Sequence, residues 1–261
     1  MSISGLSWLK FGLFTVGLGQ SFVFVLVPPL ARELGLTVIQ TSSIFAISAM
    51  AWALTSAFWG RASDKYGRRN IAILGLVGYA ISLIALITPL FLAEKNILNI
   101  TLLFPALVLG RLINGLLGSA TRPASFAYMA DITSEDNRTS QFAKLESSFL
   151  VGTVAGPLIG GFLFLISNET PFYVFSFLGF VAALGIYFNF EKTNQSNANK
   201  NKKTKIKWHS ETIWPFLALA AILSLCQASL LQSIGFYITD SFYELENLPT
   251  LISMTFALLS I

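Results

Sequence analysis

Long apolar stretches, each separated from the next by a few polar residues, dominate this sequence. They cover residues 11–31, 41–59, 71–92, 101–123, 143–166, 171–190 and 213–238, and an eighth begins near Leu248. A helix of about 20 such residues crosses the hydrocarbon core of a bilayer and satisfies its own backbone hydrogen bonds, which lipid cannot do. Charged residues make up only 11% of the chain, against roughly 25% in soluble proteins. The sequence therefore predicts an all-α integral membrane protein with seven full spans and a partial eighth.

Lysine and arginine are distributed unevenly among the segments that join the predicted spans. If the N-terminus lies inside, the outer segments hold only Arg32 and Lys95, and nearly all other basic residues fall on the inner side. Cytoplasmic segments of membrane proteins carry this excess of positive charge. We therefore expect a multi-pass protein of the inner (cytoplasmic) membrane with a cytoplasmic N-terminus.

A polar segment rich in asparagine and lysine, residues 191–211, divides the predicted spans into two sets. We expect residues 1–190 to form a six-helix N-terminal bundle. Residues 212–261 are expected to begin a second bundle, which is incomplete because its second span is cut off at Ile261. Since the basic linker lies between membrane spans, we predict a cytoplasmic segment that contacts anionic headgroups and does not bind nucleic acid.

Motifs for nucleotide, metal or covalent chemistry are absent from the sequence. It contains no GxxxxGK[ST] phosphate loop, no His/Cys cluster with zinc spacing and no GxSxG nucleophile motif. We therefore expect a protein that is not an enzyme and that uses no cofactor or metal. Any transport that it carries out is expected to be driven by an ion gradient or to be passive.

The segment between the second and third predicted spans has the pattern G-x-x-x-D-[RK]-x-G-R-[RK]. Its defining residues are Gly60, Asp64, Gly67, Arg68 and Arg69. Physically it is expected to be a tight cytoplasmic turn, in which the glycines permit close or left-handed backbone and the arginines sit at the inner leaflet. A positive-inside loop would explain the composition but not the full spacing. The pattern resembles the signature loop of the major facilitator superfamily.

Two further segments are similar to motifs of the same superfamily. In the fourth span, Arg111 and Asn114 lie within the stretch LGRLINGLLG, which resembles the family's helix-four motif with a buried arginine. A charge near the bilayer centre is costly, so this helix face must turn toward protein or a water-filled cavity. A purely structural arginine paired with a carbonyl is the alternative. Asp131 and Arg138, in the segment after the fourth span, repeat the signature loop's order of Asp then Arg and suggest a three-plus-three internal repeat.

The fifth span carries a stripe of glycines. Such a stripe lets another helix backbone approach closely, and the proline beside it is expected to bend the helix. The full GxxxGPxxGG pattern resembles the motif of the drug:proton antiporter branch, which includes tetracycline-type exporters. The residues of this motif are Gly152, Gly156, Pro157, Gly160 and Gly161.

The resemblance implies a secondary active transporter that exports small organic compounds or drugs by proton antiport through alternating access. Its partners would be the substrate, protons, the lipid bilayer and the missing C-terminal bundle. Spans one, two, three, six and seven have no acidic residue in their cores, and span one offers only Gln20 to a substrate cavity. Two alternatives remain open: a nutrient symporter, and a non-transporting product or membrane partner.

Three charged side chains are candidates for coupling transport to protons. Arg111, near the midplane with no acidic neighbour in sequence, is the expected coupling residue. Arg122 and Glu146 are expected at similar depth on helices joined by one short loop, where they would form a supporting polar pair. The alternative for Glu146 is that it extends to the inner headgroups. Phe22 and Phe24 could line a drug site, although packing or lipid contact is the commoner use of such residues.

Overall fold

The computed structural model describes residues 3–189 and isolated positions between 214 and 237. Within residues 3–189 the chain forms α-helices joined by short turns, with one short 3₁₀ segment and no strand. The elements are α1 (Ile3–Glu33), α2 (Val38–Tyr66), α3 (Arg68–Glu94), α4 (Ile100–Leu116), η1 (Gly118–Ala120), α5 (Thr121–Ile132), α6 (Glu135–Phe164) and α7 (Thr170–Asn189).

Six segments of this described part are long and apolar enough to cross a membrane. Five are single helices, and the sixth, Ile100–Ile132, combines α4, η1 and α5 and is called span four here. The first six predicted spans are thereby confirmed as helices. The linker 191–211 and the eighth predicted span lie outside the described residues, as does the seventh span apart from isolated positions.

The helices extend further than the apolar stretches that predicted them. The signature segment makes a tight turn, as predicted, but helix takes up most of its residues: α2 continues to Tyr66, α3 begins at Arg68, and Gly67 alone, at φ 92°, makes the turn. Polar residues such as Asp64 and Lys65 can continue the helix because, beyond the hydrocarbon, water solvates their charges. The fourth span also differs from the predicted helix 101–123, since η1 interrupts it and places Arg122 on α5.

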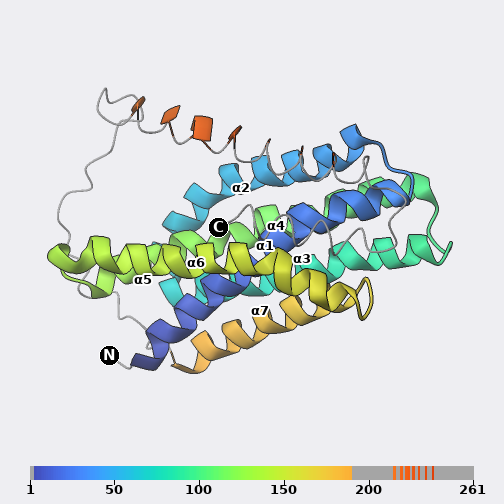
Figure 1. Cartoon of the computed structure of the whole chain (residues 1–261). Coiled ribbons are helices and arrows are strands. Elements are labelled where there is room, and N and C mark those ends of the chain that lie inside the picture. The colour runs from blue at the N-terminus through green and yellow to red at the C-terminus, as the bar shows by residue number, and fades with distance from the viewer. Residues whose placement is uncertain are drawn as a thin grey trace.

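The spans run back and forth between two ends of one bundle (Figure 1). The N-terminus, the α2–α3 turn, the α5–α6 turn and the end of α7 lie at one end, which we call the motif end. The α1–α2, α3–α4 and α6–α7 connections lie at the opposite end, called the far end.

Helix α1 lies along the inside of the bundle and packs against α6 and α7, while α4 packs against α2 and α3. Span one thus contacts spans five and six, and span four contacts spans two and three in the same way. This correspondence is the arrangement expected of a three-plus-three repeat. Helices α1 and α3 are mostly buried, whereas α2, span four and α6 leave much of their apolar surface exposed. Such exposure is large for a water-soluble protein and is normal for helices that contact lipid or another bundle.

Candidate functional site

Arg111 lies on α4, inside the bundle. It is eleven residues beyond Ile100, the first residue of α4, or about 16 Å along the helix, in a core that is about 30 Å thick. Its side chain is only 4% exposed. The Nε atom is fully covered and has no hydrogen-bond partner in the described part of the chain, and none of the ion pairs found there involves Arg111.

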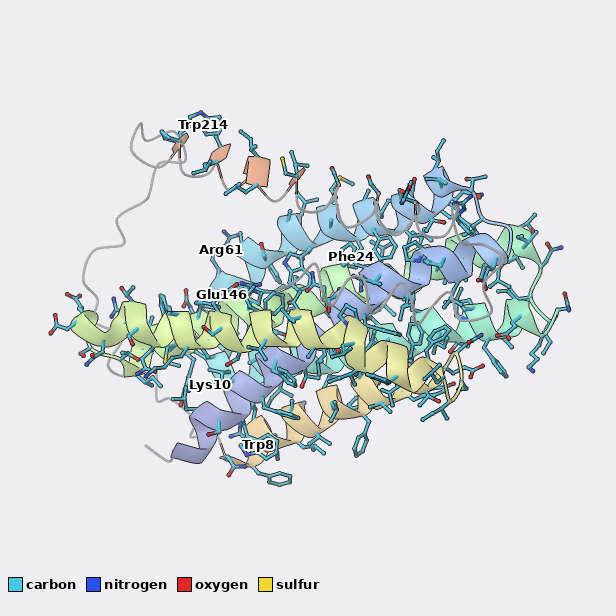
Figure 2. The ribbon with its side chains drawn as sticks, in the orientation of Figure 1. Trp8, Lys10, Phe24, Arg61, Glu146 and Trp214 are labelled. Atoms are coloured by element: carbon cyan, nitrogen blue, oxygen red, sulfur yellow. The ribbon has the colours of Figure 1, made fainter. Side chains whose placement is uncertain are left out.

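Aromatic rings take the place of a counter-ion around this guanidinium. The Cζ atom of Arg111 lies 5.5 Å from the ring centroid of Phe24 on α1 and 5.5 Å from that of Phe45 on α2. Figure 2 marks Phe24 in the middle of the bundle. On the same helix, Asn114 is 4% exposed and its Oδ1 lies against Gly118, where a β-carbon would meet it closer than 3.0 Å.

Span four is interrupted directly after the Arg111 segment, and α2 supplies hydrogen bonds there. Ser48 Oγ donates to the Arg111 carbonyl at 2.9 Å. Thr55 Oγ1 lies 3.0 Å from the Gly115 carbonyl oxygen and shares its one proton between that acceptor and the Ala51 carbonyl of its own helix, at 2.7 Å. Trp59 Nε1 donates to the Leu116 carbonyl at 2.6 Å. The carbonyls near the break are thus satisfied inside the protein, as an apolar surrounding requires. We call the three bonds to span four the α2 hydrogen-bond row.

Sequence reasoning missed the α2 hydrogen-bond row. The available signal was the spacing of seven between Ser48 and Thr55, which places both hydroxyls on one helix face.

Arg122 and Glu146 meet across the boundary between α5 and α6. Arg122 Nη2 lies 2.7 Å and 2.5 Å from the two carboxylate oxygens of Glu146, and its Cζ lies 4.3 Å from the ring centroid of Phe149. The side chains of the pair are 32% and 37% exposed, and Figure 2 marks Glu146 on α6. The structure thus holds Glu146 against an arginine of the neighbouring helix.

At the motif end, Arg68 joins three helices. Its guanidinium pairs with Asp64 on α2 at 2.5 Å and with Asp131 on α5 at 3.0 Å. It also donates to Ser63 Oγ at 2.6 Å. The structure therefore brings the two predicted loop motifs together through one arginine.

The other motif arginines make different contacts. Arg69 donates to the carbonyl of Tyr187 at the end of α7 and lies 4.7 Å from that residue's ring centroid. Arg138 donates to the Ala130 carbonyl at 3.4 Å. Gly60 sits in regular α2 helix, where a β-carbon would come no closer than 4.0 Å to Pro123.

The glycine stripe of α6 faces α1. A β-carbon at Gly152 would lie closer than 3.0 Å to the Phe14 carbonyl oxygen, and one at Gly156 equally close to the Leu18 carbonyl oxygen. Opposite Gly160 lies the Phe22 ring, and Gly161 and Pro157 are also buried. The two helix backbones therefore approach each other closely along the stripe, which fixes α6, and with it Glu146, relative to the inner helix.

The aromatic residues of α1 pack within the protein. Phe22 is completely buried, with ring centroids 4.9 Å from Phe172 and 5.2 Å from Phe175. Phe24 stacks on Phe45 at a centroid distance of 4.8 Å. These contacts favour the packing interpretation of both residues over a free drug-binding surface in this arrangement of the helices.

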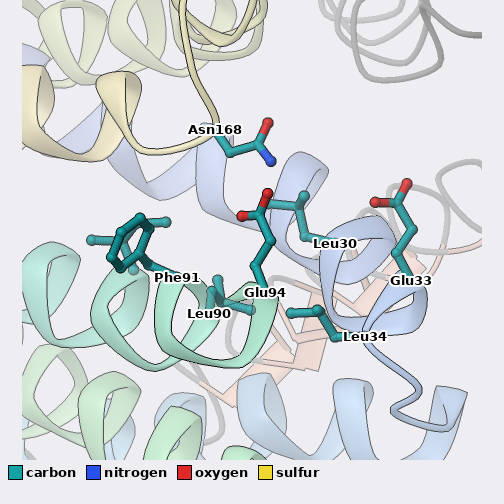
Figure 3. A pocket seen from close by; sticks show the side chains of 8 residues that line it. Leu30, Glu33, Leu34, Leu90, Phe91, Glu94 and Asn168 are labelled. Carbon is teal, nitrogen blue, oxygen red and sulfur yellow. The ribbon is translucent and has the colours of Figure 1, made fainter. Parts of the chain in front are cut away.

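A small cavity of about 90 Å³ lies at the far end, and neither Arg111 nor Arg122 lines it. Glu33 at the end of α1 and Glu94 at the end of α3 line it, together with Asn168 from the α6–α7 connection. Figure 3 shows the side chains of Glu94 and Asn168 next to each other across this cavity. Gln20 is half-buried on α1 and does not line it, so its place in a substrate cavity stays a prediction. Within residues 3–189 and the isolated described positions, no three metal-ligating side chains gather.

Comparison with known proteins agrees with this architecture. The sequence profile of the Major Facilitator Superfamily matches residues 9–261. The chain is 31% identical over 171 residues to the tetracycline resistance protein, class B, of Escherichia coli, which covers 66% of this chain and 39% of that protein. It is 26% identical over 220 residues to the quinolone resistance protein NorA of Staphylococcus aureus strain MRSA252, covering 84% and 54% of the two chains.

This chain thus spans about 39–54% of the length of these relatives. The profile match extends over nearly the whole sequence, and the described part consists of membrane-spanning helices that bring the motif residues together. This protein belongs to the major facilitator superfamily and is a multi-pass membrane protein of its transporter fold.

Proposed function

We propose that this chain is the N-terminal portion of an exporter of small organic compounds that works by proton antiport. Residues 1–190 form the first bundle, 191–211 the cytoplasmic linker and 212–261 the start of the second bundle. The motif end faces the cytoplasm and the protein lies in the inner membrane, as the distribution of basic residues favours. Relatives whose names record tetracycline and quinolone resistance support drugs as the substrate class.

The observation that carries this proposal is the buried Arg111, which forms no ion pair and whose Nε has no hydrogen-bond partner among the residues that the structure describes. A charged side chain in the middle of a membrane span costs energy unless a partner compensates it, so its presence without one indicates a functional site. A proton-dependent acceptor, or an acceptor group of the substrate, would supply that partner during part of the transport cycle. Arg111 is therefore the proposed coupling residue, with Asn114 beside it on the same buried face of α4.

The paired residues are proposed to support this site. Arg122 and Glu146 neutralise each other between Arg111 and the motif end, where they form one side of a proton path. Arg68, with Asp64 and Asp131, fastens α2, α3 and α5 together and stabilises the state in which these helix ends lie close. Transport would alternate access by rocking this bundle against a second one around the midplane.

Efflux measurements in energised cells test the proposal. The chain is produced alone, and residues 1–211 are joined to the C-terminal bundle of the class B tetracycline resistance protein to give a hybrid. Uptake of tetracycline and of a fluorescent quinolone is followed in both cases. One bundle supplies only one wall of a substrate cavity, so the chain alone should give no energy-dependent efflux. The hybrid should export, and a protonophore should abolish the export.

Arginine variants then separate coupling from folding. In the hybrid, Arg111→Ala should abolish efflux while membrane insertion stays intact, whereas Arg61→Ala, which removes an exposed arginine of α2, should leave efflux unchanged. Arg111→Lys retains the charge but not the planar set of donors, so its loss of efflux would assign the role to hydrogen bonding. Undiminished protonophore-sensitive efflux in Arg111→Ala would remove this residue from the mechanism.

A nutrient symporter is the second candidate. In the same hybrid it would show uptake coupled to protons, so that energised cells would accumulate the substrate and would not expel it. The GxxxGPxxGG motif of the fifth span, on α6, favours the exporter. If the chain and the hybrid both insert and neither shows efflux or uptake, the result would favour a non-transporting membrane protein.

A further inference from the structure

Three helices converge on one aromatic contact in the middle of the bundle. Phe24 from α1 and Phe45 from α2 stack with their ring planes 27° apart, and the guanidinium of Arg111 from α4 lies within 5.5 Å of both centroids. Phe45 is 3% exposed and Arg111 is 4% exposed, so little water reaches this contact. We call the two rings the aromatic cradle.

An aromatic cradle holds a cation differently from a carboxylate. The face of each ring carries partial negative charge and attracts a cation within about 6 Å, most strongly where water is excluded. Unlike a carboxylate, a ring has no strong acceptor atom, so the five N–H donors of arginine are not used up by it. Two described carboxylates of the motif residues form ion pairs with other arginines: Glu146 pairs with Arg122, and Asp131 pairs with Arg68.

The backbone of Arg111 is held from the same side. Ser48, three residues after Phe45 on α2, donates a hydrogen bond from its hydroxyl to the Arg111 carbonyl at 2.9 Å. Helix α2 therefore restrains both the main chain and the side chain of this arginine, and α1 supplies the second ring.

We propose that Phe24 and Phe45 are the positioning residues of Arg111, which keep its guanidinium charged inside the bundle and leave its donors available to an acceptor group of the transported compound. This inference rests on the coupling role proposed for Arg111. It adds that the compound's recognition group is a hydrogen-bond acceptor, such as a carboxylate or a carbonyl. A cationic ammonium group would meet an arginine that forms no ion pair with any acid in the described part of the chain.

Hydrogen exchange at the Arg111 Nε–H group tests the aromatic cradle without any transport assay. The 261-residue chain is labelled with ¹⁵N-arginine in detergent micelles, and the Arg111 signal is identified by its loss in Arg111→Lys. Phe24→Leu and Phe45→Leu remove a ring and should speed exchange with water roughly tenfold, as expected for loss of a desolvated cation–π contact. Phe45→Tyr keeps the ring and should retain slow exchange.

Phe126→Leu is the matched control. Phe126 pairs with Phe142 at a centroid distance of 5.3 Å, so the substitution breaks a similar aromatic pair and should leave the Arg111 exchange rate unchanged. If a leucine variant fails to fold, a fluorinated phenylalanine at position 45 preserves the ring shape, weakens its negative face and should still accelerate exchange. Unchanged exchange in the folded leucine variants, or in the fluorinated chain, would overturn the proposal.

Efflux by the hybrid protein gives the second readout. Phe45→Leu should lose efflux and Phe45→Tyr should retain it, because only the aromatic residue positions the guanidinium. Full efflux in Phe45→Leu would overturn the positioning role. Full efflux in Arg111→Ala, with slow exchange still present in the unmodified chain, would instead refute the proposed coupling function.

Discussion

Adding a single methyl group to the glycine stripe of α6 should show how much the close packing of α1 against α6 contributes to stability, apart from the effect of helix propensity. In Gly152→Ala the new β-carbon would lie closer than 3.0 Å to the Phe14 carbonyl oxygen, and a β-carbon at Gly17 of α1 would come equally close to the Phe149 carbonyl oxygen. The obstacle is backbone on a buried helix, so it cannot rotate aside as a side chain would. Relief requires that α1 and α6 separate, which weakens contacts along the whole interface.

The size of the effect follows from two opposing terms. Overpacking by one methyl group costs about 1–3 kcal/mol, and the upper half of this range applies because the obstacle is rigid. Alanine returns about 1 kcal/mol of helix propensity relative to glycine. Gly152→Ala should therefore lower the free energy of unfolding by about 1–2 kcal/mol. Gly60→Ala, where the nearest atom would be 4.0 Å away, should raise it by up to about 1 kcal/mol.

Unfolding in mixed micelles with increasing dodecyl sulfate measures both variants, with circular dichroism as the signal. Gly60→Ala serves here as the control for helix propensity alone. The reasoning would be refuted if Gly152→Ala were as stable as the unmodified chain while Gly60→Ala showed the expected increase, because helix separation would then carry no cost.

The remaining predictions concern the α2 hydrogen-bond row and the topology. Thr55→Val keeps the side-chain shape but leaves the Gly115 carbonyl without the donor that the structure shows. It should lower the free energy of unfolding by about 1–2 kcal/mol in the same assay. Equal stability of Thr55→Val and Thr55→Ser would contradict the role of the hydroxyl. For the topology, single cysteines at Asn197 and Glu244, in a Cys226→Ser background, should react with an impermeant thiol reagent from opposite sides of the membrane, the first from the cytoplasm. Reaction of both from one side would rule out the odd number of spans between them.

The positions of the first six spans could be predicted because lipid leaves the backbone few alternatives. The burial of Arg111 could be predicted too, since a charge halfway along an apolar helix must avoid lipid. The groups that surround Arg111 could not be predicted, because Phe24, Phe45 and Arg111 belong to three helices and sequence spacing carries no information on the distances between them. The break in span four was also missed, because Gly118 and Ser119 do not exclude regular helix and the α2 donors that bond the carbonyls beside the break are distant in the sequence.

The α2 hydrogen-bond row has a consequence for how this bundle can move. Its three donors follow one face of α2, and their acceptors are main-chain carbonyls of span four. A displacement of either helix along the other by one residue, about 1.5 Å, would break these bonds, of which the Ser48 bond is buried and the Thr55 bond half-buried. Each buried group left unpaired would cost about 1–3 kcal/mol. Shear between α2 and span four is therefore disfavoured. The pair should travel as one rigid body, so that motion of the bundle is of the hinge type and originates outside this helix interface.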